Sequence, residues 1–448
     1  MISPYLIQLL NKKGFLINKN YFVFKLILKN FYKLFNFLYS FFLTPVSINL
    51  VLFLKLKNKY YKNKYFSLRI SERYFGHHAI EPAIASSIQS SNENKVVFVS
   101  IKEKNNLGNK KLKNIIKQSF ILMEDYKLKI LENIYYKSFK FFRVKIKNFY
   151  QPLFPNLSKY REIKYWPYLD SSKKFKWRDN ALGMLGKNTF SKNNKNIVIA
   201  LRTHHFHKNT KLVKPQNYRN AEYDDLVFIL EACIREFTDV EIICFFSSEI
   251  CHNLSKRFIG TSNLRFVSQE NVDILDILTP QSLLINNGNG IGAAAFAIGI
   301  KTLLLLHSPW TAWFTSNANA IMLPIEYLDL KKTDDRSLDQ IFNLAFYPKE
   351  HVPWDYEKEY FANNIILQKI KDIDIQILKS TIREAYEMEI NSKFKKNIEF
   401  LNTSINYCSN KEKIFWKMYV ERMPKEMRCC HKKISMSISS SFLESFKK

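Results

Sequence analysis

Glycine and arginine are both scarce in this sequence. Its 448 residues include only 10 glycines, and its 69 basic residues comprise 14 arginines and 55 lysines. Arginine is the residue that reads phosphate and guanine through two-point contacts, and no zinc-finger, helix-turn-helix or RNA-binding motif accompanies the lysines. The net charge of +29 therefore does not by itself indicate a nucleic-acid partner. We expect none, and keep a basic nucleic-acid-binding protein as an alternative.

Paired cysteines are also missing. The six cysteines form no C-x-x-C pair and show no zinc-ligand spacing. Cys429 and Cys430 are adjacent, which is a poor geometry for an ordinary disulfide. The cysteines thus give no sign of an oxidising compartment or of a structural zinc site, and a reducing cytosol fits them best.

Acidic residues are absent before Glu72, whereas residues 1–66 carry eleven lysines. Within this segment the uncharged run 34–54 has about the 20-residue length that crosses a bilayer. Pro45 in its middle weakens a straight spanning helix. We expect residues 1–66 to lie on an anionic membrane surface as a peripheral or monotopic segment. A single spanning helix, or two core helices of the first domain, are the alternatives.

The remaining chain is long enough for two domains, and it alternates strands with helices. Apolar runs predict strands at 66–70, 96–100, 197–201, 241–246, 264–267, 282–285 and 302–306. Helices are predicted at 79–90, 224–237, 250–259, 273–278 and 292–298, followed by a helical region from 358 and a basic tail at 429–448. This alternation is typical of doubly wound α/β domains.

The glycines cluster in one place, N-N-G-N-G-I-G at 286–292. The cluster follows a predicted strand and opens a small-residue helix, where backbone N–H groups and the helix dipole favour a phosphate. The spacing matches neither the dinucleotide G-x-G-x-x-G nor a P-loop. We expect a diphosphate to bind Asn287, Gly288, Asn289, Gly290, Ile291 and Gly292. A merely tight turn between strand and helix is the alternative.

A second motif, L-R-T-H-H-F-H at 201–207, follows the strand predicted at 197–201. Arg202 stands at the carboxyl end of that strand and is a candidate clamp for a diphosphate. His204, with His205 and His207, suits polar contacts to the ligand. A metal site is the alternative, but no carboxylate at ligand spacing accompanies these histidines, so we expect no metal.

A third motif, R-Y-F-G-H-H-A-I-E at 73–81, leads from a strand into a helix through Gly76. The turn presents His77, His78 and Glu81, whose side chains can act as a general base near neutral pH. Capping or packing roles at the start of this helix are the alternative.

Together these blocks, over roughly residues 67–330, resemble the heptosyltransferase-like and fucosyltransferase-like GT-B glycosyltransferases of bacterial surface-polysaccharide synthesis. The resemblance implies two Rossmann-like domains, with the Gly76 loop facing the acceptor and Arg202 holding the donor diphosphate. Where many of these enzymes have a histidine two residues before that arginine, this sequence has Ala200. The predicted division is a membrane-associating segment 1–66, an acceptor domain 67–185, a nucleotide-sugar domain 186–355 and a helical region with a basic tail 356–448.

The resemblance implies transfer of a sugar from a nucleotide-sugar donor to a polysaccharide or lipid-linked glycan acceptor, without a cofactor. Such an enzyme would work at the cytoplasmic face of the inner membrane. A nucleotide-sugar epimerase on the same fold is the alternative enzyme. Trp310 and Trp313, just past the strand 302–306, either stack on a base or sugar or belong to the core.

Overall fold

A computed structural model of the chain describes part of its length. It describes residues 64–70, 76–90, 95–101, 109–124, 126–127, 175–186, 195–203, 220–306, 319–324, 327–329, 365–367, 369–388, 398–399, 433–434 and 437–445. The membrane prediction for 1–66 falls almost entirely outside these residues and stays a prediction. Among the residues that the structure describes, no helix is long and apolar enough to cross a bilayer.

The chain divides into two compact units, Met1–Lys64 with Tyr126–Pro155, and Tyr65–Asp125 with Asn156–Lys448. Nearly all described residues belong to the second unit. The predicted domain boundaries stay a prediction.

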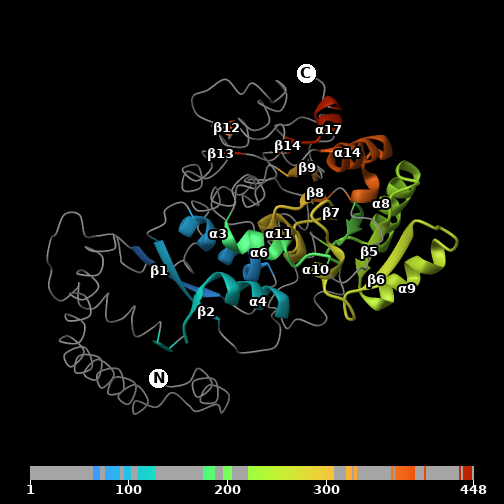
Figure 1. Cartoon of the computed structure of the whole chain (residues 1–448). Coiled ribbons are helices and arrows are strands. Elements are labelled where there is room, and N and C mark those ends of the chain that lie inside the picture. The colour runs from blue at the N-terminus through green and yellow to red at the C-terminus, as the bar shows by residue number, and fades with distance from the viewer. Residues whose placement is uncertain are drawn as a thin grey trace, which may run out of the picture. The chain divides into compact units, whose positions relative to one another are not determined.

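A parallel sheet of seven strands forms the centre of this second unit (Figure 1). Its order is β14-β9-β8-β7-β4-β5-β6, and every neighbouring pair is parallel. The strands are β4 (Ile197–Ile199), β5 (Ile242–Phe246), β6 (Leu264–Ser268), β7 (Leu283–Asn286), β8 (Lys301–Leu306), β9 (Ala320–Pro324) and β14 (Ser437–Ile438). The inner strands are buried along their length, which explains why they read as continuous apolar runs in the sequence.

The strand order reverses between β4 and β7. From β4 the chain runs outward through β5 to β6, then returns to the other side of β4 and continues through β7, β8 and β9. Ile197 of β4 pairs with Leu283 of β7, and Ile199 pairs with Ile285. In open parallel sheets ligands bind at the carboxyl ends of the strands where the order reverses. The carboxyl ends of β4 and β7 are therefore where a ligand is expected.

Helices connect these strands and confirm the predicted alternation. They are α8 (Tyr223–Glu236), α9 (Ser248–Arg257), α10 (Ile274–Ile277), α11 (Gly290–Ile298) and α14 (Ile375–Glu387). Ser247, Asp273 and Asn289 each cap a helix by accepting a backbone N–H two or three residues ahead. At the other end of α11 the left-handed Gly299, with φ of +94°, ends the helix.

A second sheet lies earlier in the chain, with the order β1-β2-β3. Its strands are β1 (Lys64–Ile70), β2 (Lys95–Ile101) and β3 (Ile121–Leu122), and its helices are α3 (His77–Ser90) and α4 (Lys110–Ser119). Strands β2 and β3 are parallel. The predicted strands at 66–70 and 96–100 and the helix after Gly76 are therefore present, and this part is also α/β.

Helix α6 (Lys176–Leu182) joins the elements before and after it. The Trp177 N–H donates to Ser86 Oγ of α3 at 3.1 Å, and Arg178 Nε donates to the Ala297 carbonyl of α11 at 3.1 Å. Because the last carbonyls of a helix lack internal partners, the Arg178 guanidinium stabilises the carboxyl end of α11. Helices α3, α6 and α11 thus pack on one another within the unit.

The C-terminal segment completes the large sheet. Strand β14 adds to β9, and helix α17 (Ser440–Glu444), with Phe442 almost fully buried, packs on α14. The Thr381 and Ser439 hydroxyls share a hydrogen bond of 2.5 Å between these elements. The sequence pattern at 429–448 indicates only a basic tail, because a two-residue strand is too short to show a hydrophobic period.

Two short antiparallel pairs and one turn of 3-10 helix make up the remaining described elements. They are β10 (Tyr327–Asp329) with β11 (Ile365–Leu367), β12 (Ile398–Glu399) with β13 (Lys433–Ile434), and η6 (Ile370–Asp372). The region after residue 358, predicted as helical, therefore contains helix α14 but also short strands.

Candidate functional site at the strand-order reversal

The glycine cluster forms a tight turn from β7 into α11. Strand β7 ends at Asn286, Gly288 takes a left-handed φ of +75°, and α11 begins at Gly290. Asn289 Oδ1 accepts the Gly292 N–H at 2.7 Å and caps the helix. The N–H groups of Gly290 and Ile291 have no acceptor among the described residues, and both residues are partly exposed. These two groups are available to a ligand.

Asparagine side chains fasten this turn to the end of β4. Asn287 Oδ1 accepts the Arg202 N–H at 2.7 Å, and Asn287 Nδ2 donates to the Arg202 carbonyl at 3.2 Å. Asn289 Nδ2 donates to the Ala200 carbonyl at 2.5 Å. The structure therefore brings Arg202 and the 286–292 turn together, although 85 residues separate Arg202 from Asn287. Because both amides bond the protein backbone, they act here as supports of the turn.

The loop at Gly76 lies against the same turn. Gly76 directly precedes α3, and its carbonyl accepts the Ile80 N–H at 2.9 Å. A Cβ at position 76 would stand 3.0 Å from Ala293 Cβ and 3.3 Å from Gly290 Cα. Only glycine allows this approach of the starts of α3 and α11. The loops predicted to face acceptor and donor are thus in contact.

The three candidate bases lie on α3 in different surroundings. His78 is fully buried, and Glu81 is 9% exposed. His77 is the first residue of α3, and its side chain lies outside the described structure. A general base has to touch the proton that it removes, so burial bears directly on these candidates. Their catalytic role stays a prediction.

The described residues on either side of positions 204–219 meet at the reversal point. Thr203 and Ala221 form an isolated parallel bridge, and the Ala221 N–H donates to the Arg202 carbonyl at 2.8 Å. His204, His205 and His207 lie outside the described residues, as do Trp310 and Trp313. No group of three or more potential metal ligands occurs among the residues that the structure describes.

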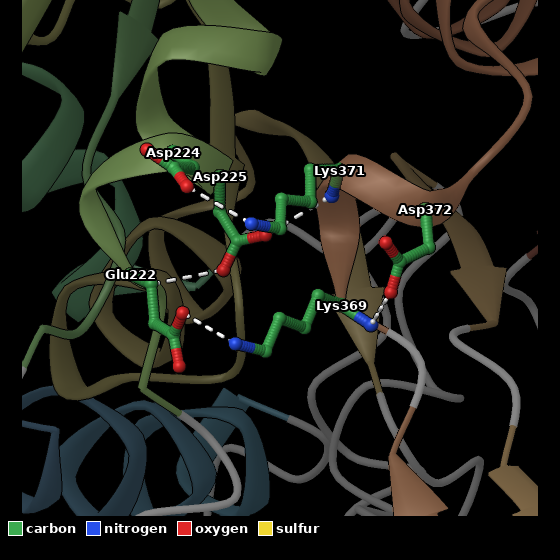
Figure 2. A network of polar contacts seen from close by, with 6 residues as sticks. All are labelled: Glu222, Asp224, Asp225, Lys369, Lys371 and Asp372. Atoms are coloured by element: carbon green, nitrogen blue, oxygen red, sulfur yellow. Dashed lines mark hydrogen bonds and ion pairs between the residues drawn. The ribbon is translucent and has the colours of Figure 1, made fainter.

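An ion-pair cluster, which we call the charge clasp, joins Glu222, Asp224 and Asp225 to Lys369 and Lys371 (Figure 2). Lys369 Nζ pairs with Glu222 Oε2 at 2.5 Å, and Lys371 Nζ pairs with Asp224 Oδ2 at 2.9 Å. Asp225 accepts the Lys371 N–H at 3.0 Å, and burial raises the pKa of its carboxyl. The hydrogen bond from Lys371, with its charge, lowers the pKa of Asp224. The clasp fixes η6 to the start of α8.

A polar cluster that the sequence analysis did not identify lies at the carboxyl ends of β5 and β6. Ser248 Oγ lies 2.7 Å from Ser268 Oγ and donates to Glu270 Oε2 at 3.0 Å. Desolvation alone would raise the pKa of Glu270, but hydrogen bonds from Ser268 and Ser248 bring it below its usual value. The available signal is that serines directly follow two apolar runs, at 247–248 and at 268.

This arrangement defines a class of protein: a doubly wound α/β protein with a glycine-rich turn and an arginine at its reversal point. No protein-family model matches the sequence, and neither does any curated protein.

Solved structures resemble the chain at low sequence identity. The E. coli ADP-heptose lipopolysaccharide heptosyltransferase II is 10% identical with a TM-score of 0.34, over 58% of this chain and 90% of that one. A family 9 glycosyl transferase from Veillonella parvula DSM 2008 is 9% identical with a TM-score of 0.38, over 72% and 97%. A UDP-N-acetylglucosamine 2-epimerase is 10% identical with a TM-score of 0.31, over 72% and 96%.

Proposed function

We propose that this protein is a glycosyltransferase that moves a sugar from a nucleoside-diphosphate sugar to a polysaccharide or lipid-linked glycan acceptor. The observation that carries the proposal is the meeting of Arg202 with the start of α11 at the reversal point. A helix N-terminus attracts anions because its first N–H groups are unpaired and its dipole is positive there. Arg202, whose backbone bonds Asn287 in the same turn, would add a full positive charge at this edge of the sheet.

A diphosphate leaving group uses these charges in the reaction. The acceptor hydroxyl oxygen bonds to the anomeric carbon, and the bond from that carbon to the diphosphate oxygen breaks. The hydroxyl proton passes to a base, and the departing diphosphate gains negative charge. Groups arranged beforehand around that charge, such as the N–H groups of Gly290 and Ile291, stabilise the transition state.

The polar cluster on β5 and β6 suits the nucleoside half of the donor. Ser248, Ser268 and Glu270 lie at the same sheet edge as Arg202, beyond β4. A ribose offers two neighbouring hydroxyls as donors, and the Glu270 carboxylate is an acceptor for both. A nucleotide laid along this edge would have its diphosphate at α11 and its ribose at Glu270.

The acceptor would approach from the start of α3. Gly76 lies against Gly290 and Ala293 at the start of α11, so groups at the start of α3 lie close to the proposed diphosphate. The base that we propose is His77, His78 or Glu81. Membrane association through the lysine-rich segment 1–66 is part of the same proposal, because it would bring a lipid-linked acceptor to the enzyme.

The test is a ligand screen on the full-length chain, with thermal unfolding as the readout. UDP, GDP, ADP and CMP, and sugars linked to them, are compared with the uncharged nucleosides. We expect one nucleotide, at about 100 times its Kd, to stabilise the protein by about 2.7 kcal/mol, and its nucleoside to have far less effect. A folded protein that no nucleotide stabilises would contradict the proposal.

Product analysis then separates the two enzyme classes. A glycosyltransferase releases the nucleoside diphosphate and attaches the sugar only when an acceptor is present. An epimerase changes the sugar nucleotide without any acceptor, and that result would replace the proposal with the alternative.

A further inference from the structure

Asn286, which the sequence analysis did not select, lies at the base of the α11 turn. It is the last residue of β7, and its side chain is completely buried. Its Oδ1 accepts the Gly288 N–H at 2.9 Å. Because Gly288 adopts a left-handed φ of +75°, this hydrogen bond holds the turn in a conformation that other residues rarely take.

The same side chain packs against the first turn of α11. A Cβ at position 292 would overlap the Asn286 amide, with Oδ1 as the nearest atom and Nδ2 3.0 Å away. Glycine at 292 is thus required by the presence of Asn286. The two residues form an interlock, which sets how closely the end of β7 approaches the start of α11.

The side-chain amide nitrogen of Asn286 has no hydrogen-bond acceptor among the described residues. It is buried, whereas nearly all buried donors in proteins are paired. This donor lies against Gly292 in the first turn of α11, the turn in which the N–H groups of Gly290 and Ile291 also have no partner among the described residues. An unpaired amide donor and two unpaired N–H groups in one helix turn favour an anion as the ligand that compensates them.

We propose that Asn286 is a positioning residue for the donor diphosphate, holding the turn through Oδ1 and adding the positive end of its amide to the anion site. This inference rests on the proposed function. It explains why a neutral amide occupies the position: an aspartate has the same shape and also accepts the Gly288 N–H, but its charge would repel the diphosphate.

The isosteric change Asn286→Asp tests this, with Asn196→Asp as its matched control. Asn196 is also fully buried, its Oδ1 accepts Ser282 Oγ at 2.6 Å, and its Nδ2 likewise lacks a partner among the described residues. Asn196 lies at the amino end of β4, away from the turn. Calorimetric titration of the full chain would compare the best nucleoside diphosphate with its uncharged nucleoside.

We expect Asn286→Asp to weaken diphosphate binding by about tenfold or more and to leave nucleoside binding unchanged, because only the diphosphate meets the new charge. Asn196→Asp should change neither. If the wild type binds the nucleotide and Asn286→Asp binds it equally well, this inference is wrong and the proposed function stands. If the wild type binds no nucleotide, the proposed function fails and takes the inference with it.

The interlock can be tested without a ligand, which matters if Asn286→Asp does not fold. Gly292→Ala should lower the unfolding temperature, because its Cβ meets the Asn286 amide. Adding Asn286→Ala vacates that space, so the double variant should unfold at a higher temperature than Gly292→Ala alone. A double variant no more stable than the single one would overturn the interlock and the positioning role built on it.

Discussion

The carboxyl ends of the strands of the large sheet (the carboxyl edge) and their amino ends (the amino edge) both contain buried polar side chains. The two edges differ in how far these polar groups are enclosed. At the carboxyl edge, Asn287 and Asn289 bond the backbone of Arg202 and Ala200 just after β4, and the part-exposed Gly290 and Ile291 have N–H groups without a partner among the described residues. At the amino edge, Lys301 is 5% exposed and its Nζ donates to the Tyr386 carbonyl at 2.5 Å. One edge presents its polar groups, and the other encloses them.

The enclosed edge shows what burial does to a charge. Burial, together with repulsion from Lys195, lowers the pKa of Lys301 to about 8. The Lys195 ammonium lies 4.3 Å from the centre of the Tyr386 ring. Helix α14, which carries Tyr386, packs on β8 and covers Lys301, whereas α11 begins at the carboxyl edge with the positive end of its dipole there. Helix direction therefore makes the carboxyl edge the more favourable place for an anion.

Among the variants considered, Arg202→Ala, at the carboxyl edge, is expected to lower nucleotide affinity the most. In the proposed site this change removes a charge-assisted contact to the diphosphate, worth about 2–3 kcal/mol, so nucleotide affinity should fall by about 100-fold. Titration calorimetry measures this loss. The control is Arg235→Ala, because Arg235 is exposed on α8 and pairs only weakly with Glu231 at 3.9 Å. Equal losses in the two variants would mean that net charge alone, and no site, attracts the nucleotide.

Because Lys301 is buried at the amino edge, we expect the stability of the protein to depend on pH. The pKa of Lys301 is about 8 in the folded chain and 10.5 when unperturbed, so the unfolded state binds more protons between these values. The free energy of unfolding should therefore rise by about 2 kcal/mol as pH increases from about 8 to about 10.5. Lys301→Met should abolish this part of the rise in denaturant titrations, and Lys256→Met, on the exposed face of α9, should retain it. A rise of the same size in both variants would assign it to other groups.

Two glycines with the same left-handed backbone conformation, Gly288 and Gly260, separate an effect on nucleotide binding from an effect on stability alone. Gly288 in the α11 turn has φ of +75°, and Gly260 before β6 has φ of +85° with no atom within 4 Å of an added Cβ. Replacing either by alanine should cost about 1 kcal/mol of stability, because L-residues disfavour this region. Only Gly288→Ala should also weaken nucleotide binding, since only that turn faces the ligand. Loss of binding in Gly260→Ala would show a global effect instead.

The smallest effect is expected at the charge clasp. Glu222 and Lys369 are both more than 40% exposed, so their pairing should contribute about 0.5 kcal/mol at low salt and less at high salt. A double-mutant cycle of Glu222→Gln and Lys369→Gln, followed by urea unfolding, isolates this pairing energy. A coupling energy that persists unchanged in high salt would show that the pair is better shielded from solvent than its exposure indicates.

Local patterns predicted much of the fold correctly. The apolar runs at 241–246, 282–285 and 302–306 became β5, β7 and β8, because a strand buried on both faces needs apolar side chains throughout. The glycine cluster became the turn into α11, since Gly288 needs its left-handed φ. The short β14 was not predicted, because two residues are too few to show a hydrophobic period. Helix α4, which has ten residues, was not predicted either.

The polar groups of the site were harder to predict than the strands. His78 and Glu81 were chosen for their chemistry, but which face of α3 is buried depends on its packing against α11. Asn286 belongs to the N-N-G-N-G-I-G motif but was not among the residues predicted to bind the diphosphate, because the sequence does not show what its side chain touches. Its significance comes from Gly292, which has no side chain to show that the two residues touch.

The order of strands and helices and the position of the glycine turn follow from the sequence alone, because hydrophobic period and backbone freedom are local properties. The contacts between the groups of the site, in contrast, depend on the tertiary structure. Arg202 meets Asn287 because β4 and β7 are neighbours in the sheet, and Gly76 meets Gly290 because α3 packs on α11. Strand order and helix packing arise from contacts between distant segments, so no short stretch of sequence carries them.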